Sequence, residues 1–257
     1  MRRRPFFAAL LPVLLLASCG PASTTGSSGT GGATTELTVF AAASLRVVFD
    51  EVSTKFEEAN PQVTVRFNYA GSADLITQLD AGAPADVLVT ANQSTMDRAV
   101  DAGTITAAPA VIASNVPVLV TPADNAAGVT DLESAVALGV DLVVCAPQVP
   151  CGAATQTIAE NAGIELTPVS EENSVTDVLG KVTSGQADAG IVYATDAADA
   201  GDAVTTIELP GADQARTEYP AAVTASTEHP DQAQAFVDFL RQDPVQALLA
   251  DAGFQQP

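Results

Sequence analysis

Residues 37–90, LTVFAAASLRVVFDEVSTKFEEANPQVTVRFNYAGSADLITQLDAGAPADVLVT, decide the fold class. Short apolar runs with strand composition alternate here with segments that carry apolar side chains at helical spacing. We expect strands at 37–40, 63–69 and 86–90, and helices at 45–59 and around 75–79. This alternation predicts a parallel sheet with helices on both faces, that is, an α/β fold.

The rest of the chain continues the alternation, and no repeat of fixed period is found. We expect strands at 115–121, 142–144, 189–193, 204–209 and 221–224, and helices at 96–102, 154–162, 175–182, 232–240 and 244–252. At 257 residues the chain fits two α/β lobes with a ligand cleft between them. The first lobe is expected at 36–116, the second at 117–222, and the chain returns to the first over 223–257.

The charge balance excludes several classes of partner. The chain has 31 acidic and 10 basic residues, so its net charge is −21, and removal of Arg2, Arg3 and Arg4 with a signal peptide would make it −24. Such a field repels nucleic acids and anionic membranes. With one His and no Trp, we expect neither aromatic cages nor a multi-histidine metal site. We also expect no cofactor.

The first 35 residues are predicted to contain a targeting signal and a flexible linker. Residues 1–18 carry three arginines and then an apolar run too short to span a bilayer comfortably, as in a secretory signal peptide. The run ends in Leu16-Ala17-Ser18-Cys19, which resembles a bacterial lipobox and implies lipidation of Cys19. A plain signal peptide with an incidental cysteine is the alternative. Residues 19–35, rich in Gly, Ser and Thr, are expected to be a flexible linker that leaves the folded part anchored outside the cell membrane.

Two further cysteines lie six residues apart. In an oxidising compartment Cys145 and Cys151 are expected to form a disulfide. The alternative is a zinc site, which lacks a third and a fourth ligand because His229 is the only histidine.

Several predicted helices begin in a similar way, with small residues that directly follow a strand. These starts lie at Ser44, at Ser72, after Cys151-Gly152 and near Val175. Each start leaves backbone N–H groups without partners inside the helix and carries the positive end of a helix dipole. A serine before a helix is ordinarily an N-cap, but four such starts in two lobes could converge on one oxyanion.

Three segments together resemble a known family. They are Ala41-Ala42-Ala43-Ser44-Leu45, Ala81-Gly82-Ala83-Pro84-Ala85-Asp86-Val87 and Gly190-Ile191-Val192-Tyr193-Ala194-Thr195-Asp196-Ala197. In this order they resemble the periplasmic molybdate-binding proteins of molybdate ABC importers, over about residues 37–254. The resemblance implies a two-lobed periplasmic-binding-protein fold of type II. It also implies that tetrahedral molybdate or tungstate lies in the cleft, so that molybdenum is bound only as its oxyanion.

The family's ligand contacts fall on five positions of this chain. The resemblance implies hydroxyl and backbone donors at Ser44 and Ser72, backbone N–H donors at Cys151 and Val175, and a phenol donor at Tyr193. Cys151 departs from the small residue usual in the family, which a backbone contact tolerates. Tyr193 could instead be plain core packing, because it ends an apolar strand. The resemblance further implies a monomer that delivers its ligand to the membrane permease of an ABC importer.

Other functions remain open at this stage. A protein of the same architecture could bind sulfate, thiosulfate or an organic acid. A serine hydrolase would need a base near Ser44 or Ser72, and neither serine lies in a Gly-x-Ser-x-Gly motif. A surface adhesion module would bind no small anion.

Overall fold

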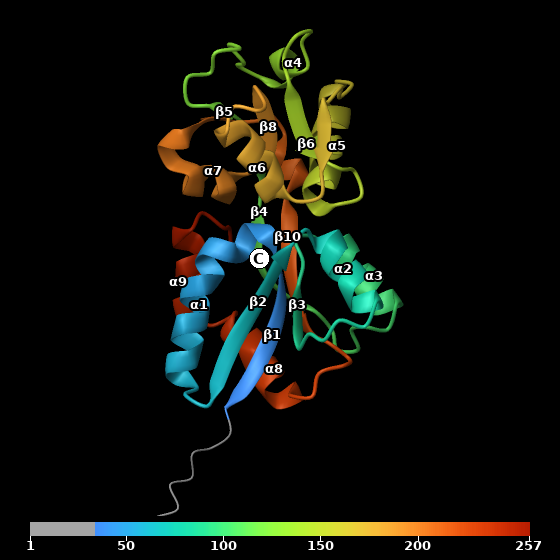
Figure 1. Cartoon of the computed structure of the whole chain (residues 1–257), viewed down its shortest axis with the longest axis vertical. Helices are drawn as coiled ribbons and strands as arrows, with labels where there is room; N and C mark the ends of the chain where they lie inside the picture. Colours follow the sequence, from blue (N-terminus) through green and yellow to red (C-terminus); the bar gives the residue numbers. More distant parts are fainter. Residues whose placement is uncertain (1–33) are drawn as a thin grey trace, which may run out of the picture. The chain divides into compact units, whose positions relative to one another are not determined.

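The structure is a computed structural model that describes residues 34–257, whose strands form two five-stranded sheets. The predicted signal peptide (1–18), Cys19 and nearly all of the predicted linker (19–35) lie outside the described residues. Figure 1 shows the two sheets, each flanked by helices, as two lobes of the described part.

The first sheet has the strand order β2-β1-β3-β10-β4. Its strands are β1 (Thr35–Ala42), β2 (Val63–Ala70), β3 (Val87–Val89), β4 (Ala110–Asn115) and β10 (Thr217–Val223). The helices of this lobe are α1 (Arg46–Ala59), α2 (Ser72–Asp80), α3 (Gln93–Asp101), α8 (Pro230–Phe239) and α9 (Asp243–Asp251). A short 3-10 turn, Ala43–Leu45, joins β1 to α1, so that the helical path begins just before Ser44.

The second sheet has the strand order β7-β6-β8-β5-β9. Its strands are β5 (Pro117–Pro122), β6 (Leu142–Cys145), β7 (Ser170–Glu172), β8 (Ala189–Tyr193) and β9 (Val204–Ile207). The helices are α4 (Leu132–Ala135), α5 (Pro150–Ala162), α6 (Val175–Thr183) and α7 (Ala194–Ala200), with 3-10 turns at Gly201–Ala203 and Ala212–Ala215. The α/β two-lobed fold class expected from the sequence is confirmed.

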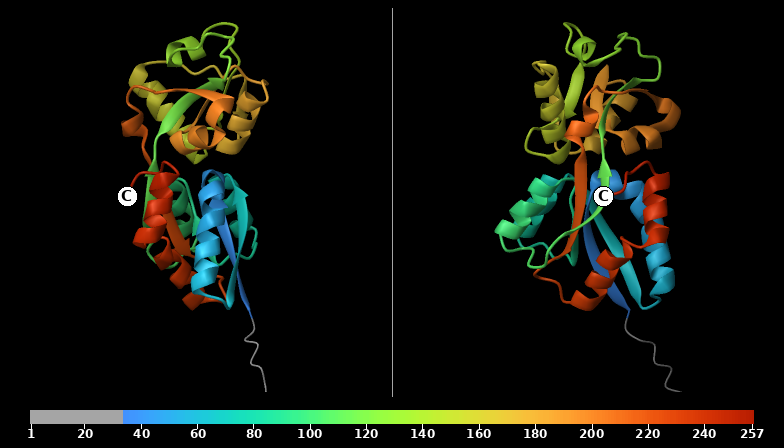
Figure 2. Two further views of the ribbon diagram at one scale, coloured as in Figure 1. Left: turned by 90° about the vertical axis from the view of Figure 1, so that its left-hand side faces the viewer. Right: turned by 180° about the vertical axis from the view of Figure 1, so that it is seen from behind.

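Neither sheet is purely parallel, which corrects the sequence-based expectation. β1 runs parallel to β2 and β3, but β10 is antiparallel to β3 and β4, and β5 is antiparallel to β8 and β9. The reason is that the chain passes between the lobes in extended segments, and an antiparallel strand needs no crossover helix. Figure 2 shows β4 and β10 running toward the second sheet.

The chain returns to the first lobe earlier than expected from the sequence, which placed the end of the second lobe at residue 222. β10 begins at Thr217 and pairs with β3 and β4 of the first sheet. Its pattern is hard to read because Pro220 interrupts the strand and the register shifts between Tyr219 and Pro220.

Apolar side chains of both sheets are buried, and the largest buried cluster includes residues of both lobes. In the first lobe, one face of α1 packs Phe49 and Phe56 edge-on against Phe236 of α8, with ring centroids 6.5 and 5.1 Å apart. This packing holds the start of α1, and Ser44 with it, at the end of β1. Between residues 34 and 257, no helix is long and apolar enough to cross a membrane.

Candidate ligand-binding site

A small cavity of about 20 Å³ lies where the helix starts of both lobes meet. Its lining comes from five turns and one strand end: Ala42, Ala43, Ser44, Gly71, Ser72, Ala91, Val149, Pro150, Cys151, Asn173, Ser174, Val175 and Tyr193. One water molecule needs at least about 10 to 15 Å³ by the same measure, so the cavity in this structure has room for about one water molecule.

All five residues that the sequence proposed as ligand contacts line this cavity. Ser44 lies in the turn after β1, and Ser72 is the first residue of α2. Cys151 lies in the first turn of α5, Val175 begins α6, and Tyr193 ends β8. The first lobe therefore supplies two of them and the second lobe supplies three, from segments up to 149 positions apart in the chain.

The two serine hydroxyls are held by neighbours that leave a hydrogen to donate. Ser72 Oγ accepts a hydrogen bond from the backbone N–H of Ala91 at 3.1 Å, and among the described residues its own O–H has no acceptor. Ser44 Oγ lies 2.9 Å from Tyr219 Oη, where either oxygen can donate. When the Tyr219 phenol donates, the Ser44 hydrogen is free for a ligand.

Tyr193 carries a buried polar atom without a partner. The side chain is 1% exposed, and its Oη forms no hydrogen bond to any described residue. Burial raises the pKa of Tyr193 well above its ordinary value. The polar side chain of Thr217 opposes this effect, and the negative charge of Asp196 adds to it. The phenol therefore keeps its proton, and an unpaired buried donor is costly unless a ligand accepts it.

The wall formed by α5 is fixed by a disulfide and a close backbone contact. Cys145 and Cys151 form the disulfide expected between them, with Cα atoms 5.7 Å apart. A Cβ atom at Gly152 would lie 1.9 Å from the carbonyl oxygen of Ala146, so only glycine allows the helix to start this close to the strand end. The contact therefore fixes the first turn of α5, whose Pro150 and Cys151 line the cavity.

None of the cavity-lining residues is charged. Asp, Glu, Lys, Arg and His are all missing from the set, and the donors are hydroxyl, phenol and backbone N–H groups. Within residues 34–257, no cluster of three or more His, Cys, Asp and Glu side chains is arranged to hold a metal ion. Three hydroxyl donors and four helix starts suit a small anion, and the missing carboxylates disfavour a cation.

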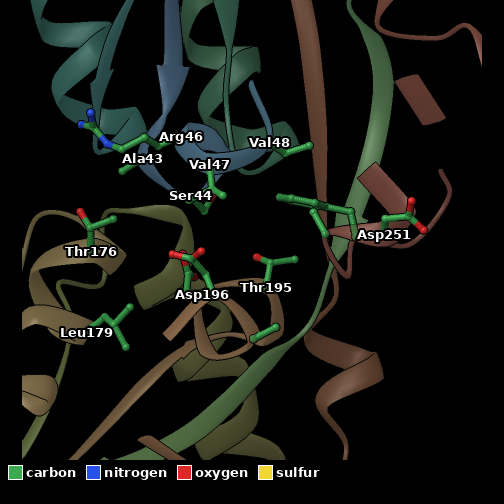
Figure 3. A pocket seen from close by; sticks show the side chains of 14 residues that line it. Ala43, Ser44, Arg46, Val47, Val48, Thr176, Leu179, Thr195, Asp196 and Asp251 are labelled. Atoms are coloured by element: carbon green, nitrogen blue, oxygen red, sulfur yellow. The ribbon is translucent and has the colours of Figure 1, made fainter. Parts of the chain in front are cut away.

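A larger hollow of about 290 Å³ adjoins this cavity and shares Ala43 and Ser44 with it. Figure 3 shows Arg46 and Val47 on one side of this hollow, facing Thr176 and Asp196. Three carboxyl groups line it, those of Asp196, Asp199 and Asp251. This concentration of acids makes the larger hollow less suitable for an anion than the small cavity.

Asp196 connects the two spaces. Its carboxyl oxygen accepts a hydrogen bond from the backbone N–H of Tyr193 at 3.1 Å, although its side chain is almost fully buried. Burial raises the pKa of Asp196 to about 7, with a further contribution from Asp199, while the Tyr193 N–H opposes the shift.

Sequence reasoning missed several residues that shape the site. Gly71 and Asn173 line the cavity beside Ser72 and Ser174, and their adjacency to those serines was the only available signal. Tyr219, which contacts Ser44, lies 175 positions away on β10, and nothing in its neighbourhood pointed to the cavity.

Known proteins resemble this chain over nearly all of the residues that the structure describes. A profile of the family described as bacterial extracellular solute-binding protein matches residues 37–255. The molybdate-binding protein ModA of Mycobacterium tuberculosis H37Rv is 40% identical over 243 residues, which cover 94% of this chain and 93% of that protein.

Solved structures share the architecture. The periplasmic molybdate-binding protein of Azotobacter vinelandii superposes with a TM-score of 0.75 at 20% identity, covering 86% of this chain and 99% of that one. The sulfate-binding protein SubI of M. tuberculosis H37Rv superposes with a TM-score of 0.71 at 23% identity, covering 86% and 87%. At these identities the superpositions establish the fold alone.

Proposed function

Because the chain belongs to the family of bacterial extracellular solute-binding proteins, we propose that it binds molybdate outside the cytoplasm and delivers it to an ABC importer. The observation that carries the proposal is the small uncharged cavity in which Ser44, Ser72, Cys151, Val175 and Tyr193 meet. The 40% identical relative, a molybdate-binding protein, supports the choice of ligand.

The cavity holds the dianion through neutral donors. Hydrogen bonds to an ionised acceptor are roughly twice as strong as neutral ones. The hydroxyls of Ser44 and Ser72, the Tyr193 phenol and the helix N–H groups together supply about five to eight such bonds, enough for submicromolar affinity. No counter-charge is required, because the donors are already oriented when the ion arrives.

The same donors discriminate between oxyanions. Phosphate near pH 7 retains a proton that needs an acceptor, and no carboxylate lines the cavity. Its hydroxyl group would be buried unpaired, which disfavours phosphate. Sulfate is fully ionised, so only the size of the cavity separates it from molybdate. Tungstate has the same charge and shape as molybdate, and we propose that it binds as well.

The test is a calorimetric panel of molybdate, tungstate, sulfate and phosphate with the wild type, Ser44→Ala and Ser72→Ala. The expected result is submicromolar binding of molybdate and tungstate, weaker binding in each variant by about tenfold or more, and no heat from phosphate. The exposed Ser184, distant from the cavity lining, provides the matched control Ser184→Ala. Sulfate bound more tightly than molybdate would favour the sulfate-binding alternative, and tight phosphate binding would overturn the site.

We propose further that lipidated Cys19 anchors the protein to the outer face of the cell membrane. The lipobox-like Leu16-Ala17-Ser18-Cys19 supports this, and the Gly-, Ser- and Thr-rich residues that follow give the folded part reach toward a permease. In cell fractionation, the wild type is expected in the membrane fraction and Cys19→Ala in the medium or the soluble fraction. Equal distribution of the two would contradict the anchor.

A further inference from the structure

We propose that Gly71 is the residue that lets the two lobes close over the ligand, a role that rests on the proposed oxyanion-binding function. A Cβ atom built at Gly71 would lie 2.0 Å from the backbone oxygen of Asn173 and 3.1 Å from its carbonyl carbon. Real Cβ atoms do not approach an oxygen this closely, so no other residue fits here in the present arrangement.

The requirement comes from space and not from backbone conformation. Gly71 has φ −58° and ψ 138°, values that any residue adopts. Gly82 and Gly103 differ from it, because their positive φ angles favour glycine by conformation. A Cβ atom at either of these two positions would meet no neighbouring atom. A substitution at Gly71 is thus compatible with the fold of its own lobe.

The contact joins the two lobes at the rim of the cavity. Gly71 directly precedes α2 in the first lobe, and Asn173 connects β7 to the cap of α6 in the second. Both residues line the cavity. The hydrogen that glycine carries in place of a side chain faces the Asn173 carbonyl, as in a weak C–H···O contact.

The Asn173 carbonyl cannot easily turn away from a larger residue. On one side, the preceding carbonyl, that of Glu172, accepts a hydrogen bond from the N–H of Ala146 at 2.9 Å. On the other side, the Ser174 hydroxyl caps α6 by accepting from the N–H of Asp177 at 3.3 Å. Because the chain is held on both sides of Asn173, the clash between a methyl group at position 71 and the Asn173 carbonyl is relieved by moving the lobes apart.

Separation of the lobes would weaken binding without removing any donor. Ser44 and Ser72 belong to one lobe and Cys151, Val175 and Tyr193 to the other, so the ion contacts the full set only when the lobes are closed. Apparent affinity scales with the fraction of molecules in the competent state. A closed state made rare therefore raises the dissociation constant and speeds release of the ion.

The experiment compares Gly71→Ala with Gly180→Ala in the full chain. Gly180 lies on α6, its φ is not positive, and a Cβ there would meet nothing, so it receives the same methyl group without a clash. Calorimetry with molybdate is expected to show affinity reduced about 10- to 100-fold for Gly71→Ala and unchanged for Gly180→Ala. Small-angle scattering at saturating molybdate is expected to give a larger radius of gyration for Gly71→Ala than for wild type.

The outcomes separate this role from the proposed function. Binding of molybdate by wild type tests the function, whereas the ratio of Gly71→Ala to wild type tests Gly71. If another tetrahedral oxyanion binds wild type instead, the same ratio is measured with that ion. Affinity within about threefold of wild type, or an unchanged radius of gyration, would overturn the proposal. A loss of more than about 5 °C in the melting temperature without ligand would also overturn it, because the clash would then lie within one lobe.

Discussion

At the scale of single residues, the buried phenol of Tyr193 is the most direct sign of a missing partner. The residue lines the cavity, and its oxygen forms no hydrogen bond within the described part of the chain. The cost of this arrangement is recovered only when an acceptor enters. Removal of the oxygen alone therefore separates a ligand contact from core packing.

For Tyr193→Phe we expect molybdate affinity to fall by about 10- to 100-fold, since a hydrogen bond to a charged group contributes about 1.5 to 3 kcal/mol. Stability without ligand should be unchanged or higher, because an unpaired polar atom is removed. Calorimetry and thermal melts measure the two effects. Wild-type affinity in this variant would make Tyr193 a packing residue.

The carboxyl group of Asp196 makes the stability depend on pH. In the unfolded chain it titrates near 4, whereas burial raises its pKa to about 7 in the folded protein. Because the folded pKa is the higher one, its contribution to stability is complete below about pH 4 and is lost as pH rises through about 7.

Asp196→Asn should therefore stabilise the protein relative to wild type at pH 8, by up to about 4 kcal/mol, and have little effect at pH 4. Chemical denaturation at the two pH values measures the difference. A stability change that is the same at pH 4 and pH 8 would show that this carboxyl does not titrate in between.

Residues inside short motifs were predictable from the sequence, but contacts between distant segments were not. Ser44 and Tyr193 stand in segments that resemble a family, Ser72 opens a predicted helix, and all three line the cavity. Gly71 was missed because its need for glycine arises from a carbonyl 102 positions away. Tyr219 was missed for the same reason, since its partner Ser44 lies at the other end of the chain.

At the scale of elements, the start of α5 depends on the bridge between Cys145 and Cys151. The bridge closes a short loop from the end of β6 to the first turn of the helix. In the chain-entropy description, a loop of this size contributes about 2 kcal/mol. The loop also carries the N–H groups at the α5 wall of the cavity.

For the double variant Cys145→Ala, Cys151→Ala we expect a melting temperature lower by about 4 to 8 °C. Molybdate affinity should fall as well, because the α5 wall is less constrained. The two measurements are thermal melts with and without molybdate, and wild type treated with a reductant provides a second route to the same state. An unchanged melting temperature in both would contradict a stabilising role for the bridge.

Most elements with strong apolar patterns were predicted, whereas the strand β4 and several short polar elements were missed. The helices at α1 and α6 follow apolar stripes. β7 has the sequence Ser-Glu-Glu and forms a strand only because β6 offers it a parallel edge. α7 follows β8 without a break and consists of small and acidic residues, so it has neither a turn signal nor an apolar face. In both cases tertiary context overrides local preference.

At the scale of the whole molecule, a strongly acidic protein holds an anion without a counter-charge. The chain has a net charge of −21, and none of its basic side chains lines the cavity of the described part. Long-range repulsion is damped beyond about 8 Å at physiological ionic strength. Binding then rests on short-range donors, which salt barely screens.

We therefore expect molybdate affinity to change by less than about threefold between 0.05 and 0.5 M sodium chloride. Any change should be toward tighter binding, since salt weakens the repulsion and leaves the hydrogen bonds intact. Calorimetry across this range measures it. A steep loss of affinity with salt would point to Lys or Arg in the site.

A crystal structure with molybdate, located by the anomalous scattering of molybdenum, would show whether uncharged donors from both lobes hold the ion. We expect one strong peak in the cavity between the lobes, with oxyanion contacts from Ser44, Ser72, Tyr193 and the first-turn N–H groups of α5 and α6. A peak in the acidic hollow beside Asp196, or an Arg or Lys side chain bound to the ion, would contradict this expectation.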